Sequence, residues 1–579
     1  MFSVFHAYDD EGYFLVTLRD YIHGHADYNQ IYGPFFYEVM GAVFRIPGLD
    51  VTTDSGRVVT LVLWLLTSLV GGIAVLTLTR DLWLGVAGQF LTFHALSALT
   101  SEPMHPSGLI SFLLVGLVAI AAGKSRTPRT WALLVGALIA AITLVKINVG
   151  AYAALAVAFA FAAALSGRWR QVALAATSVA LVAGPLLLMS GLFQLEWVVE
   201  LAFLVALSAA AVALAGFAVR SPAVPPIDAV WLIVGGAAVT IACLGLAAAG
   251  GLRLSDLVDS VVGAARLPQL FVLPAPVGIP DVVWAALSVA ATGAILWLRF
   301  GARASPPIPA CLRIAAGAFT WLSVLVLPSP FFLLALPLVW VAVLPPAGDH
   351  ENPTDPFVRL LLAALAVMET LQAYPVAGTQ MWLATLALVP VGAITFNDGI
   401  RQLRLWAAGR ENQSFLKVAA AVGPGALILN VAVWPLFVYL AASGYASGQP
   451  LGLPGAGLMR LPPEQASALQ SLAAAIDKDC TNLITLPRMP SLYLWTGKEG
   501  VAQLNDGIWM FSLDAAQQQS VVSQVRDKTG TCIVISQAVA DFEAEGRPIP
   551  RRPLIEYIDT AFEPAGTFGI YELLVRKPQ

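Results

Sequence analysis

The sequence predicts an all-α polytopic membrane bundle of about 12–14 transmembrane helices, followed by a small exoplasmic α/β domain at the C-terminus. The first observation is composition, because 58% of the 579 residues are hydrophobic and only 12% are charged. Soluble domains are roughly 45–50% apolar and 25% charged. The second observation is the succession of long apolar runs between residues 57 and 443. The third is the change to a mixed polar and apolar sequence from Pro450 onward.

The apolar runs indicate where the individual spans lie. Windows of about 19 residues predict helices near 57–79, 82–101, 107–123, 130–146, 148–166, 171–193, 197–219, 228–250, 282–300, 310–328, 330–346, 357–373, 379–397 and 416–443. The two runs that meet between Lys146 and Gly150 are either two spans or one broken helix. A bundle of about twelve or thirteen spans is therefore also compatible with the pattern.

The Lys and Arg residues of the short loops predict the orientation, because cationic loops resist translocation. The clusters all fall on one side of the alternating map, which is predicted to be cytoplasmic: Lys124/Arg126/Arg129, Arg168/Arg170, Arg220, Arg299/Arg303 and Arg401/Arg404/Arg410/Lys417. The chain then divides into an exoplasmic first loop (1–56), a transmembrane domain (57–443) and a soluble exoplasmic, periplasmic domain (444–579). The Ala, Leu, Val and Gly usage favours a bacterial protein, and so the inner (plasma) membrane.

Residues 1–56 have neither the charged nor the apolar region of a signal peptide, although they are predicted to be exported. A first membrane helix encoded upstream of Met1 would explain this export. The lack of a basic tract argues against a nucleic-acid partner, whereas the net charge of −4 carries little information.

The region after Pro450 has the sequence pattern of a folded α/β domain. Pro462, Pro463 and Glu464 begin a helix that reaches about Asp477, and the stretch 513–526 has helical spacing. The short runs 482–486, 531–535 and 568–575 are predicted strands. Cys480 and Cys532 both lie in this domain, where an oxidising compartment would permit a disulfide, but spacing alone leaves their pairing open. We expect a lid or scaffold here rather than a second enzyme.

The most informative residues stand near the start, where Asp9, Asp10 and Glu11 follow one another in the run from His6 to Tyr13. Adjacent carboxylates repel, so one of them holds its proton to higher pH unless a cation compensates. Such a group suits a general base, or a partner for a metal or pyrophosphate. A solvated acidic loop explains the same residues equally well.

The run Asp10-Glu11-Gly12-Tyr13 resembles the Asp-Glu signature in the first exoplasmic loop of GT-C superfamily glycosyltransferases. The run 32–37, Tyr-Gly-Pro-Phe-Phe-Tyr, is similar to the Tyr/Pro-rich stretch that follows in many members. That superfamily includes the protein O-mannosyltransferases, the lipid A aminoarabinose transferases and uncharacterised bacterial polytopic members. The predicted topology resembles theirs over the whole chain.

The resemblance implies a polyprenyl-phosphate or polyprenyl-diphosphate sugar donor, and a glycan, lipid or protein acceptor. It implies that Asp10 is the general base on the acceptor hydroxyl, with Glu11 and Asp9 as neighbours that tune or replace it. It also places Tyr13 and Tyr32 among the substrate contacts.

Further polar residues are predicted on the same face, each with a structural alternative such as a loop cap or an interface anchor. Lys146 is a lone cation at an exoplasmic span end and is a candidate ligand for the lipid phosphate. Glu369 and Gln372 lie on one helix face and are candidates to line the acceptor pocket. The remaining substrate candidates are Glu102, His105, Tyr374 and Gln380, and Arg253 and Arg266 are further phosphate candidates.

A divalent metal is compatible with the sequence but not required by it. His23 and His25 lie near the acidic run, and the candidate ligands are Asp9, Asp10, Glu11 and His25, whose spacing matches no closed metal site. A transporter or flippase for lipid-linked or small solutes is the main alternative function, although no internal repeat is evident. A catalytically silent scaffold is a further alternative.

Overall fold

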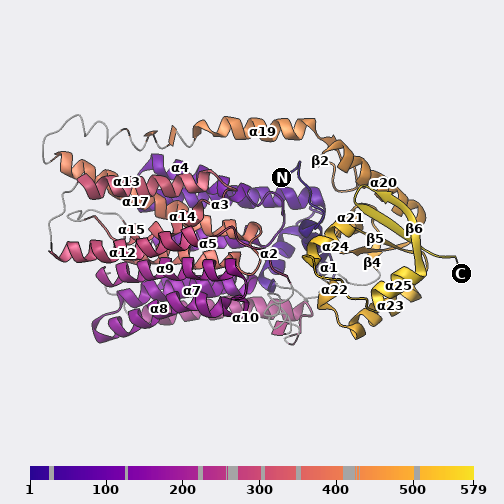
Figure 1. The fold of residues 1–579 in the computed structure, drawn as a ribbon, viewed down its shortest axis with the longest axis horizontal. Coiled ribbons are helices and arrows are strands. Elements are labelled where there is room, and N and C mark those ends of the chain that lie inside the picture. Colours follow the sequence, from indigo (N-terminus) through magenta and orange to yellow (C-terminus); the bar gives the residue numbers. More distant parts are fainter. Residues whose placement is uncertain are drawn as a thin grey trace.

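The computed structural model describes residues 1–24, 32–123, 128–219, 226–253, 271–301, 307–346, 354–408, 431–500 and 509–578, together with a few isolated residues between 254 and 430. The protein is elongated, with a bundle of helices at one end and an α/β domain at the other (Figure 1). The N-terminus lies where these two parts meet.

Two short helices precede the bundle, α1 (Asp10–Ile22) and α2 (Pro34–Phe44). The bundle follows in chain order as α3 (Thr53–Thr79), α4 (Leu82–Ser97), α5 (Ser107–Ala122), α6 (Pro128–Val145), α7 (Ile147–Ala164), α8 (Gly167–Met189), η1 (Ser190–Leu192), α9 (Glu196–Ala218), α10 (Pro226–Ala249), α12 (Ile279–Gly301), α13 (Pro307–Leu325), α14 (Phe332–Ala335), η2 (Leu336–Leu338), α15 (Trp340–Val343), α16 (Pro356–Glu369), η3 (Thr370–Ala373), η4 (Thr379–Ala384), α17 (Thr385–Ala408) and α19 (Trp434–Ser447).

Among the described residues, nine helices are long and apolar enough to cross a membrane. The predicted span near 330–346 is wrong as a single helix, since α14, η2 and α15 divide it. Pro337 lies in η2 and has no N–H to continue an α-helical ladder. The predicted span 379–397 is too short, because its helix continues to Ala408. Part of the span predicted at 416–443 lies outside the described residues, and its last residues belong to α19, which begins at Trp434.

The bundle has a buried centre and an apolar outer surface. Helices α16 and α17 are almost completely buried, whereas α10 and α12 lie at the periphery. Small residues allow close helix contacts: a Cβ at Gly136 of α6 would overlap the backbone of Leu232 in α10, and Gly235 meets Leu133 in the same way. Such small-residue contacts are the usual means of packing helices in a membrane, where lipid is as apolar as the side chains.

A charged cluster that the sequence did not reveal lies inside the bundle. Arg359 of α16 binds Asp398 of α17 through two hydrogen bonds of 2.6 and 2.8 Å, and Arg313 of α13 lies 3.5 Å from the same carboxylate. All three side chains are buried. Ionisable residues inside membrane helices are costly unless paired, so the cluster fixes the relative positions of α13, α16 and α17.

The chain reverses sharply at Lys146, which is the one residue between α6 and α7. Gly150 in the first turn of α7 lies against Thr143 at the end of α6, and a Cβ at this position would overlap Thr143. The structure therefore has two helices here rather than one broken helix.

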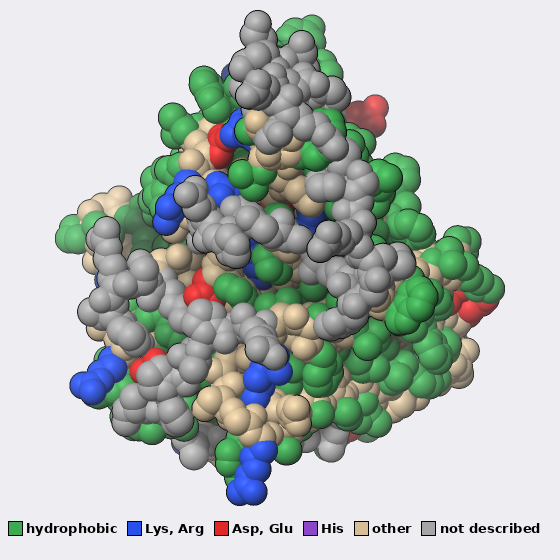
Figure 2. Space-filling view, turned by 90° about the vertical axis from the view of Figure 1, so that its left-hand side faces the viewer, with side chains coloured by type: hydrophobic (Ala, Val, Ile, Leu, Met, Phe, Trp, Pro, Cys, Tyr) green, Lys and Arg blue, Asp and Glu red, His purple; other side chains and the backbone are tan. Residues whose placement is uncertain are grey.

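The cationic ends of the helices lie away from the α/β domain. Arg80 ends α3, whose first residue, Thr53, accepts a 3.0 Å hydrogen bond from Trp495 of the α/β domain. A helix of 27 residues spans roughly 40 Å, which places Arg80 at the opposite end of the bundle. Figure 2 faces that end and shows Lys and Arg side chains on it. This separation agrees with the predicted grouping of the cationic loops, and the cytoplasmic identity of that end stays a prediction.

The C-terminal domain is an α/β layer structure, as predicted. Its elements are β1 (Gln449–Pro450), β2 (Arg460–Leu461), α20 (Pro463–Asp479), β3 (Asn482–Leu486), α21 (Ser491–Thr496), β4 (Glu499–Gly500), α22 (Trp509–Ser512), α23 (Ala515–Asp527), β5 (Thr531–Ile535), α24 (Gln537–Ala544), α25 (Pro553–Ala561), β6 (Phe562–Phe568) and β7 (Tyr571–Arg576). The main sheet has the order β4-β3-β5-β7-β6. β3 pairs in parallel with β4 and β5, and β7 is antiparallel to β5 and β6.

The predictions for this domain agree closely with the structure. The predicted strands 482–486 and 531–535 match β3 and β5, and the predicted helices match α20 and α23 to within two residues. The run 568–575 instead contains the end of β6, a turn and β7, because Gly569 has a φ of 62° and reverses the chain. Cys480 and Cys532 form a disulfide with a Cα–Cα distance of 5.5 Å.

Candidate functional site

The three consecutive acids have three different environments, because successive residues of a helix point about 100° apart. Asp9 is the N-cap of α1, whereas Asp10 and Glu11 form its first turn. The predicted group of metal ligands Asp9, Asp10 and Glu11 is therefore not formed, and His25 lies outside the described residues.

Asp9 fastens the C-terminal domain to α1. Its carboxylate accepts hydrogen bonds from the N–H and the hydroxyl of Ser491, at 2.6 and 2.8 Å, and from the N–H of Gly12 at 3.0 Å. Burial raises the pKa of Asp9 to about 7. Gly12 faces the same loop, where a Cβ would overlap both Ser491 and the Asp9 carboxylate. The Asp9 and Gly12 of the acidic run thus have a docking role.

Replacing Gly12 with Ala is expected to loosen this docking, because the new methyl group has no room unless the loop at Ser491 moves. Overpacking of this kind costs typically about 1–3 kcal/mol. Limited proteolysis of the full-length protein in detergent should cleave the variant faster between the bundle and the domain. The matched control is Gly116→Ala in α5, where a Cβ would meet nothing within 4 Å. Equal cleavage rates for both variants would contradict the docking role.

Glu11 forms a buried ion pair with Arg57 of α3. The guanidinium donates from Nε to both carboxylate oxygens at 2.9 and 3.2 Å, and from Nη2 at 2.6 Å. Arg57 also donates to the backbone carbonyls of Met1 and Val4. Since the side chains of Glu11 and Arg57 are only 3% and 1% exposed, this pair holds α1 and the N-terminal segment on the bundle rather than contacting a substrate.

Asp10 is the member of the acidic run that remains partly exposed, and its partner comes from the C-terminal domain. Arg488 donates from Nη1 to Asp10 and from Nε to the buried carboxylate of Glu543, the latter at 2.5 Å. Burial raises the pKa of Asp10, and the charge of Arg488 lowers it. Arg488 and Met489 follow β3 with φ values of 63° each, a conformation that costs about 1–3 kcal/mol per residue and clusters at functional sites.

Glu102 faces Asp10 from the α4–α5 loop. It accepts a 2.6 Å hydrogen bond from the Thr379 hydroxyl of η4 and a longer one, 3.4 Å, from Tyr8. Burial and the charge of Asp10 together raise the pKa of Glu102 to about 7. Ligand atoms of Asp10, Glu102 and His105 all lie within 4.8 Å of one another. The first turn of α1 and the α4–α5 loop, which are far apart in the sequence, therefore place two carboxylates in one site.

His105 is held as a neutral ring. Its Nδ1 accepts a hydrogen bond from the Ser107 N–H at 3.1 Å, so we assign the proton to Nε2, which lies 2.9 Å from the Tyr32 hydroxyl. Burial, with the charges of Lys146 and Arg488, lowers the pKa of His105 to about 3. The ring also packs edge-on against Phe14 of α1.

Lys146 lies beside Tyr32 at the sharp turn between α6 and α7. Its Nζ donates to the Gln380 side-chain carbonyl of η4 and stands 5.3 Å from the centre of the Tyr32 ring. Gly33 permits this approach, because its N–H binds the Val145 carbonyl at 2.8 Å and a Cβ would overlap Leu144. Four residues predicted from the sequence to bind substrate, Tyr32, His105, Lys146 and Gln380, are thus brought together.

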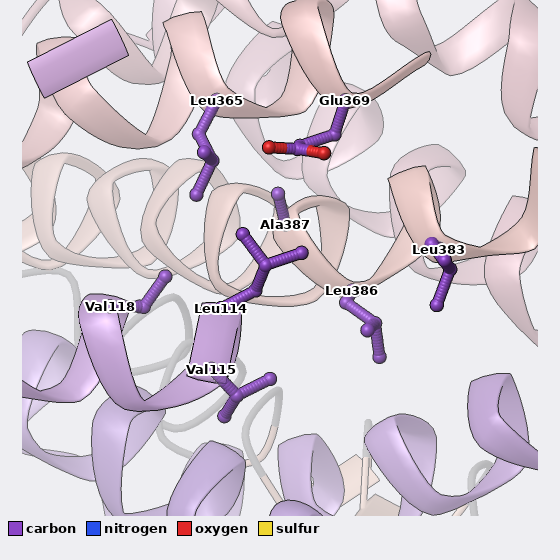
Figure 3. Close-up of a pocket in the computed structure, with 8 residues that line it drawn as sticks. All are labelled: Leu114, Val115, Val118, Leu365, Glu369, Leu383, Leu386 and Ala387. Carbon is purple, nitrogen blue, oxygen red and sulfur yellow. The ribbon is translucent and has the colours of Figure 1, made fainter. Parts of the chain in front are cut away.

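Glu369 and Gln372 lie at a pocket inside the bundle, and the Glu369 carboxylate is within electrostatic range of Lys146. The Gln372 amide donates to Glu369 Oε2 at 2.5 Å, and the buried Glu369 Oε1 has no hydrogen-bond partner among the described residues. The carboxylate is oriented towards an otherwise apolar pocket of about 240 Å³, a volume that includes space open to the outside (Figure 3). The pocket is lined by Leu114, Val115, Val118, Leu365, Glu369, Leu383, Leu386 and Ala387.

The other residues predicted from the sequence are Tyr13, Tyr374, Arg253 and Arg266. Tyr13 is half-buried beside Phe14 in α1, and Tyr374 is buried at the end of η3, before a segment that pairs with Leu273. Arg253 has no contact with the site among the described residues, and Arg266 lies outside them.

The two carboxylates fit a hard divalent cation, which prefers oxygen ligands. Asp10 and Glu102 have such oxygens close together. Both ring nitrogens of His105 already have hydrogen-bond partners, so His105 can become a ligand only by giving up Tyr32 or Ser107. A cation at this position would compete with the Arg488 guanidinium for the Asp10 carboxylate.

Sequence reasoning missed Arg57, Thr379 and Arg488. A signal for Arg488 did exist, because it directly follows the predicted strand 482–486 in the run Pro487-Arg488-Met489-Pro490. Loops at the carboxyl ends of parallel strands commonly contribute to sites in α/β domains. The approach of this loop to α1 is a tertiary contact with no local sequence pattern.

Comparisons with known protein families and with curated proteins find no match for the chain. Among solved structures, the chain is similar to the archaeal oligosaccharyltransferase AglB from Archaeoglobus fulgidus in complex with an inhibitory peptide and a dolichol-phosphate. The identity is 12% and the TM-score 0.39, over 98% of this chain and 70% of that chain. A likeness this distant leaves the function of this chain to its own residues.

Proposed function

We propose that the protein is a glycosyltransferase that moves a sugar from a polyprenyl phosphate or polyprenyl diphosphate to an acceptor hydroxyl at the exoplasmic membrane face. The observation that supports this most is the convergence of Asp10, Glu102 and His105 where the apolar bundle meets the C-terminal domain. A donor with an isoprenoid tail stays in the bilayer, so its enzyme needs a base and phosphate-binding groups at the membrane boundary. At this site Asp10 and Lys146 are the candidates for these two roles.

In the proposed reaction Asp10 accepts the proton of the acceptor hydroxyl while that oxygen bonds to the anomeric carbon of the sugar. The bond from this carbon to the phosphate oxygen breaks, and the polyprenyl phosphate, or the polyprenyl diphosphate of the second donor type, leaves with the electron pair. Lys146 is in position to bind the phosphate, because Gln380 and the Tyr32 ring hold its ammonium group at the site. The Tyr32 hydroxyl, which accepts the Nε2 proton of neutral His105, can donate a hydrogen bond to a sugar hydroxyl.

A divalent cation, when bound, would be held by Asp10 and Glu102 and would neutralise charge on the donor phosphate. The apolar pocket at Glu369 is better suited to an isoprenoid segment than to a hydrophilic acceptor, since seven of its eight lining residues are apolar. This differs from the acceptor role proposed for Glu369 and Gln372 from the sequence.

The test is transfer by the purified protein in lipid nanodiscs. Polyprenyl-phosphate and polyprenyl-diphosphate donors, each with a radiolabelled sugar, are mixed with a bacterial envelope fraction as acceptor, with and without EDTA and added Mn²⁺ or Mg²⁺. We expect label to leave the organic phase, and unlabelled polyprenyl phosphate or polyprenyl diphosphate, according to the donor, to accumulate in equal amount. No transfer from any donor would overturn the proposal. Movement of intact donor between leaflets of proteoliposomes, without loss of its sugar, would instead favour a flippase.

A further inference from the structure

We propose that Arg488 of the C-terminal domain forms a binding site for the phosphate of a lipid-linked donor, and that the phosphate displaces Asp10 from the guanidinium. The inference rests on the proposed function for the identity of the ligand. It assigns a substrate-binding role to the C-terminal domain, which the sequence predicted as a lid or scaffold.

The first argument is the position of Arg488. The positive charge of Arg488 affects the pKa values of four side chains of the site: Asp10, Glu102, His105 and Tyr32. The guanidinium therefore lies close to the whole site, although it belongs to another domain. Its side chain is 26% exposed, and a ligand can therefore reach it. The charge of Lys146 also affects the pKa of His105, so a cation from each domain lies near the same ring.

The second argument is how Arg488 is held. Glu543 of α24 is only 1% exposed and binds Nε at 2.5 Å, which fixes the plane of the guanidinium from the domain side. The Nη1 atom points to Asp10. Arginine recognises phosphate through paired N–H groups of a rigid plane. A fixed plane with one edge towards the site is the arrangement that such recognition needs.

The third argument is the conflict over Asp10. A general base must accept a proton, but an ion pair with Arg488 favours the ionised carboxylate and occupies an oxygen. If donor phosphate binds the Nη1 edge, Asp10 is released when the donor arrives and becomes available to the acceptor hydroxyl. The backbone strain at Arg488 and Met489, with φ of 63° at both, is consistent with a side chain placed for a ligand.

The experiment measures binding of radiolabelled geranylgeranyl phosphate to the full-length protein in phosphatidylcholine nanodiscs, in EDTA and without acceptor. Arg488→Gln should weaken binding by on the order of tenfold to a hundredfold, the effect of one charge-assisted contact. Arg488→Lys should lie between this variant and the wild type. Asp10→Asn should bind more tightly than the wild type, because the competing carboxylate charge is gone.

The opposite signs of Arg488→Gln and Asp10→Asn separate a phosphate site from general damage. Arg551→Gln is the matched control, since Arg551 forms an exposed ion pair with Asp559 elsewhere in the same domain. Its affinity should equal that of the wild type. Geranylgeraniol, which has the tail without phosphate, should bind all variants equally. Inorganic phosphate should show the same order of variants at lower affinity.

Two results would overturn the inference: wild-type affinity for geranylgeranyl phosphate in Arg488→Gln, or weaker binding in Asp10→Asn. A dependence on Arg488 for inorganic phosphate but not for the lipid phosphate would overturn the lipid assignment. The outcomes are independent of sugar transfer. If the variants bind in the expected order but no sugar is transferred, the proposed function is removed and the phosphate site remains. If sugar is transferred but Arg488→Gln binds like the wild type, the proposed function remains and the phosphate site is removed.

Discussion

Replacing Asp10 with Asn is expected to reduce sugar transfer by about 10²–10⁴-fold, the usual contribution of general-base catalysis. The change removes the proton acceptor and keeps the size of the side chain. Its partner Arg488 is partly exposed, and exposed ion pairs contribute only about 0–1 kcal/mol to stability. The variant should therefore unfold at nearly the wild-type temperature, and initial rates of label transfer at saturating donor provide the measurement.

The matched control for Asp10 is Asp20→Asn, near the other end of α1. Asp20 lies about ten residues and roughly 15 Å further along the helix, and it is ion-paired with neighbouring Arg19. Transfer by this variant should equal that of the wild type. Transfer by Asp10→Asn within twofold of the wild type, with normal expression, would remove Asp10 as the base.

The pH profile provides an independent check on the same residue. A base acts only when ionised, and burial raises the pKa of both Asp10 and Glu102, the latter to about 7. Raised pKa values mean that protonation at lower pH removes activity. The wild-type rate should therefore fall as the pH decreases through the range in which the carboxyl pair takes up protons and level off above that range, with apparent pKa values that belong to the pair.

Replacing Glu11 with Gln is expected to destabilise the protein by about 3–5 kcal/mol, since it leaves the buried guanidinium of Arg57 without a counter-charge. This is the largest stability effect that we expect at the site. Glu11 and Arg57 are 3% and 1% exposed, so solvent cannot replace the lost partner. The thermal unfolding temperature in nanodiscs measures the effect, and Asp10→Asn serves as the comparison.

The double variant Glu11→Leu with Arg57→Met distinguishes the ion pair from a simple packing defect. Removing both charges at once should recover part of the loss, because buried pairs can often be replaced by apolar side chains. Recovery should be incomplete, since the carbonyls of Met1 and Val4 also lose a donor. An unfolding temperature for Glu11→Gln equal to that of Asp10→Asn would contradict the anchoring role.

The opposite expectations for neighbouring acids explain why the motif is uninformative when considered as one unit. Asp9 and Gly12 dock the C-terminal domain, Glu11 anchors α1 to α3, and Asp10 faces Glu102. Loss of activity after substitution at any of them is therefore not evidence of catalysis by itself. Stability, proteolysis and phosphate binding separate the three roles.

The sequence by itself determined the apolar helices, the α/β character of the C-terminal region and the polar residues Glu102, His105, Lys146 and Gln380, whereas Tyr32 was predicted from the resemblance to GT-C glycosyltransferases. These follow from hydrophobic runs, from periodicity and from the cost of placing ionisable groups near a bilayer, all of which are local properties. Short helices α1 and α2 were not predicted, because they bury aromatic residues such as Phe36 and Tyr37 against the bundle rather than crossing a membrane.

Only the tertiary structure decided which acid of the run faces the site and which cation accompanies it. The direction of a side chain depends on the phase of α1, which Asp9 and Ser491 fix through a contact 482 residues apart. Arg488 contacts Asp10, which lies 478 residues away in the sequence. The Cys480–Cys532 disulfide and the buried cluster at Asp398 likewise join segments that are separated in the sequence. Pairings between distant segments depend on how the whole chain packs, and no local pattern of residues encodes them.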